Sequence, residues 1–196
     1  MRIVLGITGA TGSIIGVRIL RALRALNVET HLVISNWGRA TLEMETDLRA
    51  ADVHALADRV YASRDQFAEI SSGSFRTDGM IIAPCSMKTL AAIRAGYGDS
   101  LIARAADVTL KERRRLVLVP RELPLSEIHL ENMLALARMG VVIAPPVPAF
   151  YNRPTSVDDI VTHIAARVLD QFGLEVREAD RWAGRPPRPG PVVPRT

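Results

Sequence analysis

Several kinds of residue are scarce in this chain, and each scarcity narrows what the protein can be. Cys85 is the only cysteine among 196 residues, which excludes an internal disulfide framework and fits a reducing compartment. The longest hydrophobic runs, such as residues 141–146, are far too short to span a bilayer. The amino terminus begins Met-Arg and passes into an apolar strand, without the plan of a signal peptide. These features predict a cytoplasmic protein without a membrane span.

Aromatic residues form only 5% of the chain, so the core must be built from Ala, Val, Ile and Leu. The net charge is +4, and part of it lies near the end of the chain, at Arg181, Arg185, Arg188 and Arg195. Apart from K-E-R-R-R at 111–115, the basic residues are scattered and are not interleaved with aromatic stacking residues. We therefore expect no nucleic-acid partner, whereas a small anionic ligand would account for some of the arginines.

Metal-ligand spacing is missing as well. The chain has four histidines, His31, His54, His129 and His163. Their separations do not match the spacing of a zinc site. We expect no bound metal.

Short apolar runs alternate with longer helical patterns along the chain. Most runs are β-branched and continuous, as expected for strands that are covered on both faces. Repeated β-then-α units predict a mostly parallel sheet between two layers of helices, which is a three-layer α/β/α Rossmann-like fold. The predicted strands are 3–7, 30–34, 80–83, 116–119 and 141–144, and the predicted helices are 13–26, 37–46, 88–95, 101–112, 126–139 and 156–172.

Particular residues mark the element boundaries. Ser156 and Asp159 have the form of a capping box at the start of the last helix. Gly140 and Gly173 fit helix stops. The stretch 51–74 predicts a helix followed by a loop. From residue 183 onward, five prolines and two glycines in fourteen residues predict an extended tail, so we expect a single domain over 1–182 and a Pro-rich tail over 183–196.

A glycine-rich loop follows the first strand, with glycines at positions 6, 9, 12 and 16. Glycine allows a backbone to approach a ligand closely, and the start of the next helix attracts anions. The loop therefore predicts a phosphate cradle, with a structural tight turn as the alternative. The NAD fingerprint requires G-x-G-x-x-G and an acidic residue at the end of the second strand, where this chain has Ser35. A mononucleotide such as FMN fits better.

The third strand leads into A-P-C-S-M-K-T, where we expect Pro84 to end the strand. Ser86 and Thr89 can cap the next helix and bond an anion at its N-terminus. Cys85 directly follows an apolar strand and has no evident base partner. Its position indicates a buried structural cysteine rather than a nucleophile.

Charged residues follow the fourth strand. Arg121 and Glu122 stand where a solvated charge run would be unusual. Arginine clamps phosphate with a rigid fork of donors, and an adjacent carboxylate can act as a general base. Residues 113–115 are expected to form a solvated helix end instead.

Three further features are ambiguous from the residues alone. The loop P-A-F-Y-N-R-P at 148–154 combines prolines with Tyr151 and Arg153, so it could hold a phosphate or an apolar group, or simply pack. Arg167 lies in the last helix and could point either way. Glu43 and Glu45 lie late in the second helix, and without other information they read as an exposed helix face.

Taken together, these residues resemble the UbiX-type flavin prenyltransferases, which are also named small subunits of aromatic-acid decarboxylases. The resemblance covers about residues 2–182. The motifs that carry it are G-I-T-G-A-T-G, H-L-V-I-S, M-E-T-D, S-G-S-F, A-P-C-S-M-K-T-L, R-A-A-D-V-x-L-K-E-R-R-x-L-V-L-V-P-R-E, I-H-L-E-N-M-L and P-A-F-Y-x-R-P.

The resemblance implies an enzyme that joins a dimethylallyl group, taken from dimethylallyl monophosphate, to N5 and C6 of reduced FMN without a metal. The product, prenylated FMN, is supplied to a UbiD-type decarboxylase, in ubiquinone synthesis or another decarboxylation. The family also implies a homo-dodecamer with FMN held at subunit interfaces.

Carried over by position, the resemblance implies roles for individual residues. The FMN-binding positions are Gly9, Ala10, Thr11, Ser35, Ser86, Met87, Lys88, Thr89, Arg104 and Arg121. The prenyl phosphate is expected to contact Tyr151 and Arg167, with Lys111 close by and Trp182 covering a neighbouring site. Glu122 is implied to assist proton removal from C6, with Glu45 as a second polar group near the reaction.

This chain departs from the family pattern at two positions. The usual loop reads G-A-S-G with a serine implicated in catalysis, whereas this chain has Thr11, and Ile15 replaces a frequent tyrosine. Threonine keeps the hydroxyl, but its methyl group and stiff χ1 could redirect the oxygen.

Two alternatives to a flavin prenyltransferase stay open from the sequence. One is an FMN-dependent cysteine decarboxylase of related fold, whose P-x-M-N-x-x-M motif is missing here. The other is a catalytically weak FMN-storage protein.

Overall fold

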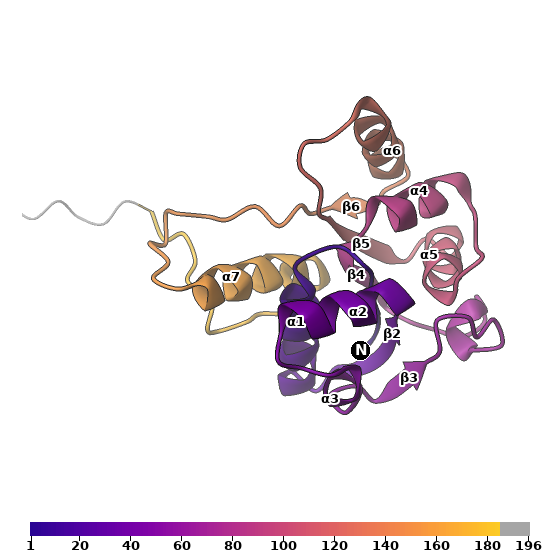
Figure 1. The fold of residues 1–196 in the computed structure, drawn as a ribbon, viewed down its shortest axis with the longest axis horizontal. Helices are drawn as coiled ribbons and strands as arrows, with labels where there is room; N and C mark the ends of the chain where they lie inside the picture. The colour runs from indigo at the N-terminus through magenta and orange to yellow at the C-terminus, as the bar shows by residue number, and fades with distance from the viewer. Residues whose placement is uncertain (185–196) are drawn as a thin grey trace, which may run out of the picture.

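Six parallel strands form one sheet in the computed structural model, which describes residues 1–184 (Figure 1). The strand order is β3-β2-β1-β4-β5-β6, and every neighbouring pair is parallel. The strands are β1 (Arg2–Ile7), β2 (Glu29–Ile34), β3 (Arg59–Tyr61), β4 (Gly79–Cys85), β5 (Arg115–Pro120) and β6 (Val142–Ile143). The predicted α/β fold with a parallel sheet is confirmed.

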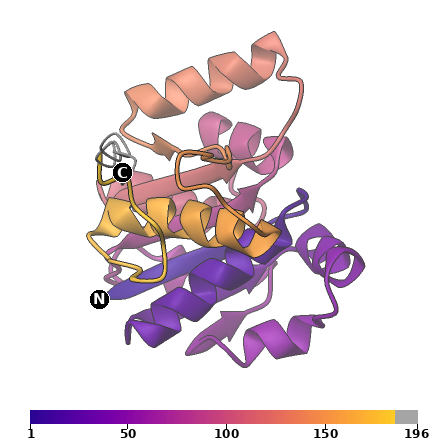
Figure 2. The ribbon, with the colours of Figure 1, turned by 90° about the vertical axis from the view of Figure 1, so that its left-hand side faces the viewer.

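Helices cover both faces of this sheet. Figure 2 shows α1 (Ser13–Ala25) and α7 (Val157–Leu169) side by side against one face. The opposite face is covered by α4 (Met87–Ala95), α5 (Leu101–Lys111) and α6 (Glu127–Arg138). The remaining helices, α2 (Asn36–Glu45) and α3 (Ala50–His54), continue the α1 side, with α2 packed beside α1 and α3 beside α2.

Alternate residues of the strands build two cores, because successive strand side chains point to opposite faces. Leu5 and Ile81 belong to the cluster under α1 and α7, whereas Val4, Met80 and Ile82 belong to the cluster under α4, α5 and α6. Each layer of helices therefore buries its own apolar surface against the same sheet.

Most predicted boundaries agree with the structure. Ser156 and Asp159 form the expected capping box at the start of α7. The helix stops at Gly140 and Gly173 are present, although α7 ends at Leu169 and a short 3-10 helix, η2 (Asp170–Phe172), follows it. Of the predicted Pro-rich tail, residues 185–196 lie outside the described residues.

Two boundaries differ from the expectation. The stretch 51–74 contains the edge strand β3 besides α3 and a 3-10 turn, η1 (Glu69–Ser71). The strand was missed because it has only three residues and they are half-buried or exposed. Pro84 does not end the third predicted strand, since β4 continues through it to Cys85, which pairs with Pro120 after an irregular register.

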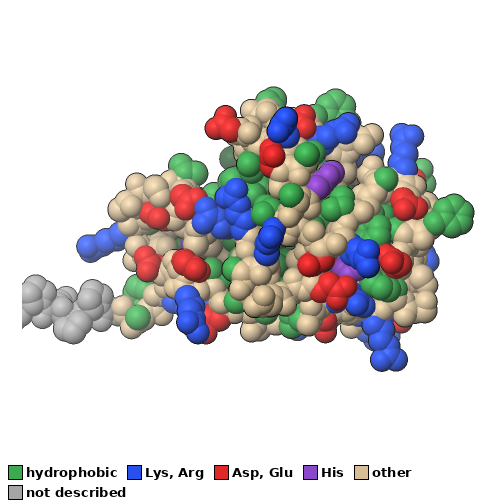
Figure 3. All heavy atoms as spheres, turned by 90° about the horizontal axis from the view of Figure 1, so that it is seen from below, with side chains coloured by type: hydrophobic (Ala, Val, Ile, Leu, Met, Phe, Trp, Pro, Cys, Tyr) green, Lys and Arg blue, Asp and Glu red, His purple; other side chains and the backbone are tan. Residues whose placement is uncertain are grey.

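Charges of both signs are interspersed over the face that Figure 3 shows, as the scattered basic residues of the sequence suggest. Within residues 1–184, no helix combines the length and the apolar character that crossing a membrane requires.

Candidate functional site

The strand order reverses between β1 and β4, and a pocket of about 360 Å³ opens beyond the carboxyl ends of the strands at this point. Ligands of open α/β sheets bind at such a reversal. The loops after β1, β2 and β4 and the start of α5 form most of its walls. The lining residues are Thr8, Gly9, Ser35, Asn36, Trp37, Ser63, Arg64, Ser86, Lys88, Thr89, Ala92, Asp99, Ser100, Ile102 and Ala103.

Three helices begin at this pocket, each with a serine N-cap. The hydroxyl of Ser35 accepts from an N–H of α2 at 2.9 Å, and the hydroxyls of Ser86 and Ser100 accept from α4 and α5 at 3.3 Å. Further N–H groups at each helix start have no partner within the helix, and the helix dipoles make these ends positive. Lys88 and Arg64 add positive charge. The pocket therefore suits an anionic ligand.

A buried threonine joins two walls of the pocket. The hydroxyl of Thr8 donates to the carbonyl of Pro84 at 2.8 Å and accepts from the N–H of Ser86 at 2.8 Å. It fixes the loop after β1 to the loop after β4. Sequence reasoning did not single out Thr8, although a hydroxyl directly after a buried strand was a usable signal.

Two of the glycines in the first loop have a packing explanation. A Cβ on Gly9 would overlap the Cβ of Trp37, and a Cβ on Gly16 would overlap the carbonyl oxygen of Ala83. Gly9 thus lets the start of α2 approach the loop, and Gly16 lets α1 approach β4. Trp37 lines the pocket with a side chain that is 75% exposed, and the sequence analysis did not identify it.

At the start of α1, two backbone N–H groups already have a partner within the chain, and the phosphate cradle expected at this loop stays a prediction. The carboxylate of Glu45 accepts from the backbone N–H groups of Gly12 and Ser13 at 3.0 Å and from the Ser13 hydroxyl at 2.8 Å. The end of α2 therefore supplies an internal anion to α1. The residues alone had suggested that Glu45 lies on a solvated helix face. In the structure its carboxylate is instead bonded to the start of α1.

Two opposing effects act on the pKa of Glu45. Burial raises it, but hydrogen bonds from the hydroxyls of Thr11 and Ser13 and from the N–H groups of Ser13 and Gly12 outweigh burial and lower it. Glu45 is thus held as a carboxylate that accepts hydrogen bonds. Its contacts make it a support for the first loop, and for Thr11 in particular.

The predicted residues near this edge either line the pocket or lie close to lining residues in the sequence. Gly9, Ser35, Ser86, Lys88 and Thr89 line the pocket. The predicted residues Ala10 and Met87 are adjacent in sequence to lining residues, and Thr11 is two positions from Gly9, but none of the three lines the pocket.

Arg121 and Glu122 follow β5 with exposed side chains. The N–H of Arg121 donates to the carbonyl of Cys85 at 3.3 Å, which places both residues at the same sheet edge. Cys85 itself is completely buried, and burial raises the pKa of its thiol, so the prediction of a structural cysteine is confirmed.

A second cluster lies on α7. The hydroxyl of Tyr151 is 3.2 Å from Nε2 of His163, and the Trp182 ring meets the Tyr151 ring edge to face with centroids 5.5 Å apart. His163 and Arg167 line a smaller pocket of about 220 Å³. Arg167 donates to Asp170 at 2.5 Å. Three residues expected to act on the prenyl phosphate, Tyr151, Arg167 and Trp182, are thus brought into one region.

Lys111 and Arg104 are not brought to the pocket by this chain. Lys111 ends α5 and pairs with Glu112. It is ten residues beyond Leu101, which is about 15 Å along the helix. Arg104 donates to the carbonyl of Ser71 at 3.1 Å and to Asp107 at 2.7 Å. The roles implied for both residues stay predictions.

The expectation of a solvated run at 113–115 fails at Arg114, whereas Arg113 and Arg115 are exposed. The Arg114 guanidinium donates to the carbonyls of Gly73 at 2.7 Å and Phe75 at 2.8 Å. The side chain therefore fixes the segment before β4.

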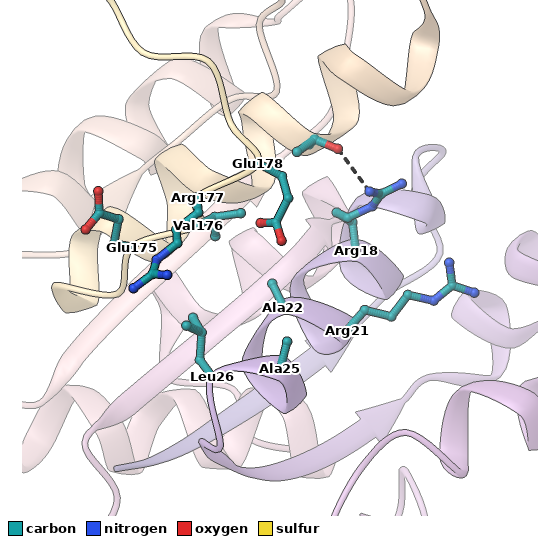
Figure 4. A pocket seen from close by; sticks show the side chains of 10 residues that line it. Arg18, Arg21, Ala22, Ala25, Leu26, Glu175, Val176, Arg177 and Glu178 are labelled. Carbon is teal, nitrogen blue, oxygen red and sulfur yellow. Dashed lines mark hydrogen bonds between the residues drawn. The ribbon is translucent and has the colours of Figure 1, made fainter.

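A larger hollow of about 570 Å³ lies elsewhere, between α1 and residues 175–178 (Figure 4). Its floor is apolar, and Arg18, Arg177, Glu175 and Glu178 mix both charges around it. The guanidinium of Arg18 donates a hydrogen bond of 3.0 Å to the Thr162 hydroxyl, which is the dashed line in Figure 4. None of the predicted site residues lines this hollow, so the edge at β1 and β4 remains the candidate site.

Across residues 1–184, no three His, Cys, Asp or Glu side chains come together in a way that could hold a metal ion. The polar residues of the pocket are serine and threonine hydroxyls, Asn36, Asp99 and the basic side chains Arg64 and Lys88.

Comparison with known proteins adds four similarities. Residues 1–169 match the family model described as Flavoprotein. A probable UbiX-like flavin prenyltransferase of Streptomyces sp. (strain D7) is 68% identical over 185 residues, which is 94% of this chain and 92% of the relative.

Two solved structures are similar over nearly the whole chain, each with a TM-score of 0.93. One is a dodecameric FMN-dependent UbiX-like decarboxylase from Escherichia coli O157:H7, 66% identical, covering 94% of this chain and 100% of the other. The second is AnUbiX in complex with FMN and dimethylallyl pyrophosphate, 58% identical, covering 94% and 98%.

Proposed function

The chain belongs to the UbiX-like flavin prenyltransferases of the flavoprotein family, and we propose that it joins a dimethylallyl group from dimethylallyl monophosphate to N5 and C6 of reduced FMN. The observation that carries the proposal is the 68% identity to a flavin prenyltransferase over 94% of the chain. The cysteine decarboxylase alternative is not favoured, because relatives of such high identity are named prenyltransferases.

The pocket at β1 and β4 fits the phosphate and ribityl chain of FMN. Ser86 and Thr89 offer hydroxyls at the start of α4, and Lys88 adds a cation beside them. A phosphate needs such donors at a helix start. Ser35 supplies a further hydroxyl from the N-cap of α2, and Gly9 lets Trp37 at the start of α2 pack closely against the first loop. When bound, reduced FMN supplies the nucleophilic atoms that accept the prenyl group.

The cluster on α7 supplies the groups for the prenyl phosphate. Loss of the allylic group leaves negative charge on the phosphate, and a fixed guanidinium stabilises charge that develops in this way. Arg167 is suitably placed on α7, and its ion pair with Asp170 holds it in position. Tyr151 brings a hydroxyl to the same region, and Trp182 packs on its ring, which helps to exclude water from the allyl cation.

The proton transfer of the reaction is assigned to a residue at the edge of the sheet where the strands end. Glu122 follows β5 with its carboxylate exposed, and we assign to it the removal of the proton from C6 after the second bond forms. Glu45 would act through its hydrogen bonds to the first loop, since its carboxylate already accepts from Gly12 and Ser13. In this view Glu45 orients the Thr11 hydroxyl.

The site is completed by other copies of the chain. Lys111 lies at the end of α5 that is far from the pocket, and the Arg104 side chain is bonded to Ser71 and Asp107. Both residues were implied to act on the ligands. A relative of known structure is dodecameric, and large apolar side chains such as Leu123, Ile128 and Leu134 are exposed here. We therefore propose a homo-oligomer, a dodecamer, in which a neighbouring copy brings Lys111 and Arg104 to the site. The product would pass to a UbiD-type decarboxylase in the cytoplasm.

The test is anaerobic incubation of the purified protein with reduced FMN and dimethylallyl monophosphate, followed by mass spectrometry of the extracted flavin. We expect a flavin that carries one added prenyl group. A tightly bound but unchanged flavin would instead support a storage role.

A further inference from the structure

A buried histidine on α7 contacts Tyr151 but has no role in the function proposed above. His163 is 6% exposed. Its Nε2 lies 3.2 Å from the Tyr151 hydroxyl, and its Nδ1 lies 3.2 Å from the backbone carbonyl of Asp180. The imidazole also meets the tyrosine ring edge to face, with centroids 5.7 Å apart. Both ring nitrogens are therefore engaged by fixed partners.

These two partners determine where the hydrogens lie. A carbonyl oxygen only accepts hydrogen bonds, so Nδ1 of His163 carries a hydrogen and donates it to Asp180. A neutral imidazole has only one such hydrogen, which leaves Nε2 as an acceptor. The Tyr151 hydroxyl is then the donor in their hydrogen bond. With neutral His163, the only hydroxyl proton of Tyr151 is turned toward the imidazole.

That arrangement is unsuitable for a phosphate. While its proton is given to His163, Tyr151 offers only oxygen lone pairs to any further partner, and these repel an anion. A second proton on the imidazole makes Nε2 a donor. The Tyr151 oxygen then accepts from His163, and its O–H becomes free for the phosphate.

We infer that His163 is a positioning residue for the prenyl phosphate, which turns the Tyr151 hydroxyl toward the phosphate when the imidazole takes up a proton. The inference rests on the proposed function, because it assumes that the phosphate binds at Tyr151 and Arg167. Binding of the anion and protonation of His163 then favour each other to the same extent.

Charged side chains on the elements around the imidazole are mostly paired with one another. Asp170 of η2 binds Arg167 and also Arg181, the latter through two hydrogen bonds of 2.7 and 3.1 Å. Asp159 accepts N–H groups at the start of α7. Asp180 meets the imidazole through its backbone carbonyl. The direct hydrogen-bonding partners of the imidazole are thus the tyrosine hydroxyl and this carbonyl.

The same hydrogen bonds supply a proton to the leaving group. As the allylic C–O bond breaks, its electron pair stays on the phosphate oxygen. The Tyr151 proton passes to that phosphate, and the Nε2 proton of His163 passes to the Tyr151 oxygen. A dianionic phosphate ester then leaves as hydrogen phosphate rather than as the far more basic trianion. The imidazole returns to its neutral form, with Nδ1 still bonded to Asp180.

Sulfate tests this coupling, because it is a tetrahedral dianion that does not itself titrate in the imidazole range. The full-length protein, loaded with oxidised FMN so that no turnover occurs, is titrated with sulfate by calorimetry in buffers of different ionisation enthalpy. The comparison between buffers counts the protons taken up for each sulfate bound. The comparison is repeated at a lower and a higher pH within the range in which the protein stays folded.

We expect uptake approaching one proton per sulfate at the higher pH and almost none at the lower pH. His163→Gln still hydrogen-bonds to Tyr151 but cannot titrate, so it is expected to bind sulfate without proton uptake. Tyr151→Phe is expected to lose most of the uptake, since the hydrogen bond that joins anion and imidazole is gone. Equal uptake in the wild type and His163→Gln, or undiminished uptake in Tyr151→Phe, would overturn the inference.

Failure of the proposed function would give a different result. Sulfate binding that does not weaken in Arg167→Ala, or no sulfate binding at all, would overturn the phosphate placement and the inference with it. An enzyme that prenylates FMN but shows no proton uptake linked to His163 would contradict the inference alone. Failure to prenylate FMN would contradict the function itself.

Discussion

The carboxylate of Glu45 lies 3.0 Å from the backbone nitrogen of Ser13, so the end of one helix caps the start of another. This contact joins α2 to the glycine-rich loop and to α1. It gives the N–H groups of Gly12 and Ser13 at the start of α1 an anionic partner within the chain.

Replacing the Glu45 carboxylate is expected to destabilise this loop. In Glu45→Gln the charge that faces the start of α1 is lost, which costs about 1 kcal/mol of unfolding free energy by analogy with lost helix caps. Urea denaturation measures the change. Glu43→Gln is the matched control, because Glu43 makes only one long contact, of 3.4 Å, to the N–H of Ala50. Equal stability of the two variants would contradict the capping role.

The hydroxyl at position 11 is expected to matter for turnover and not for flavin affinity. Thr11 directly precedes Gly12 and Ser13, which bond to Glu45, and its hydroxyl contributes to lowering the pKa of that carboxylate. Thr11→Ser is expected to keep turnover, whereas Thr11→Val, which has the same shape without the hydroxyl, is expected to lower it severalfold. Rates of prenylated-flavin formation and FMN affinities are measured for both variants. A fully active valine variant would remove Thr11 from the mechanism.

Gly9 is expected to tolerate no side chain. A Cβ there would overlap that of Trp37, and overpacking of this kind costs about 1–3 kcal/mol. Gly9→Ala should therefore lower both the melting temperature and the FMN affinity. Gly98→Ala is the control, since a Cβ at that position would make only ordinary contacts, the nearest at 3.7 Å to Arg104. Equal melting temperatures and equal FMN affinities in the two variants would contradict the close approach of Trp37 to Gly9.

Acid stability is expected to depend on Glu29, away from the site. Hydrogen bonds from Arg2 and then His31 lower the pKa of Glu29 from its ordinary 4.5 to about 2. Because the folded-state pKa is depressed, the stabilisation is complete above pH 4.5 and is lost as the pH falls from there toward 2. Glu29→Gln should flatten the fall in stability over that window, as followed by denaturant unfolding at several pH values. A variant with an unchanged profile would contradict the assignment.

Much of the fold could be predicted from the sequence because strands such as β1 and β5 are continuous apolar runs that end in clear loop signals. The edge strand β3 could not, since Arg59 and Val60 are exposed and only three residues pair with β2. The role of Glu45 also escaped prediction. Its partners are 32 and 33 positions away, and a carboxylate on a helix resembles a solvated one until the neighbouring loop is in place.

For a similar reason, some residues of the candidate site could be predicted from the sequence and others could not. Residues that directly follow strands, such as Ser35 and Ser86, were located correctly because parallel strands bring their carboxyl ends to one edge. Lys111 lies at the far end of α5. The pattern of a single chain does not reveal that it would reach the site of a neighbouring copy, as we propose. The buried partner of Tyr151, His163, gave no signal beyond a single histidine on an apolar helix face.

The most direct test of the account follows the prenyl group itself. The wild-type protein is incubated with reduced FMN and isotopically labelled dimethylallyl monophosphate, and the label is measured in the flavin and in free prenyl alcohol. The account predicts that most of the released label is found on the flavin, because the pocket favours capture of the allyl cation by flavin over water. Label that stays in the phosphate ester, or appears only in the alcohol, would contradict it.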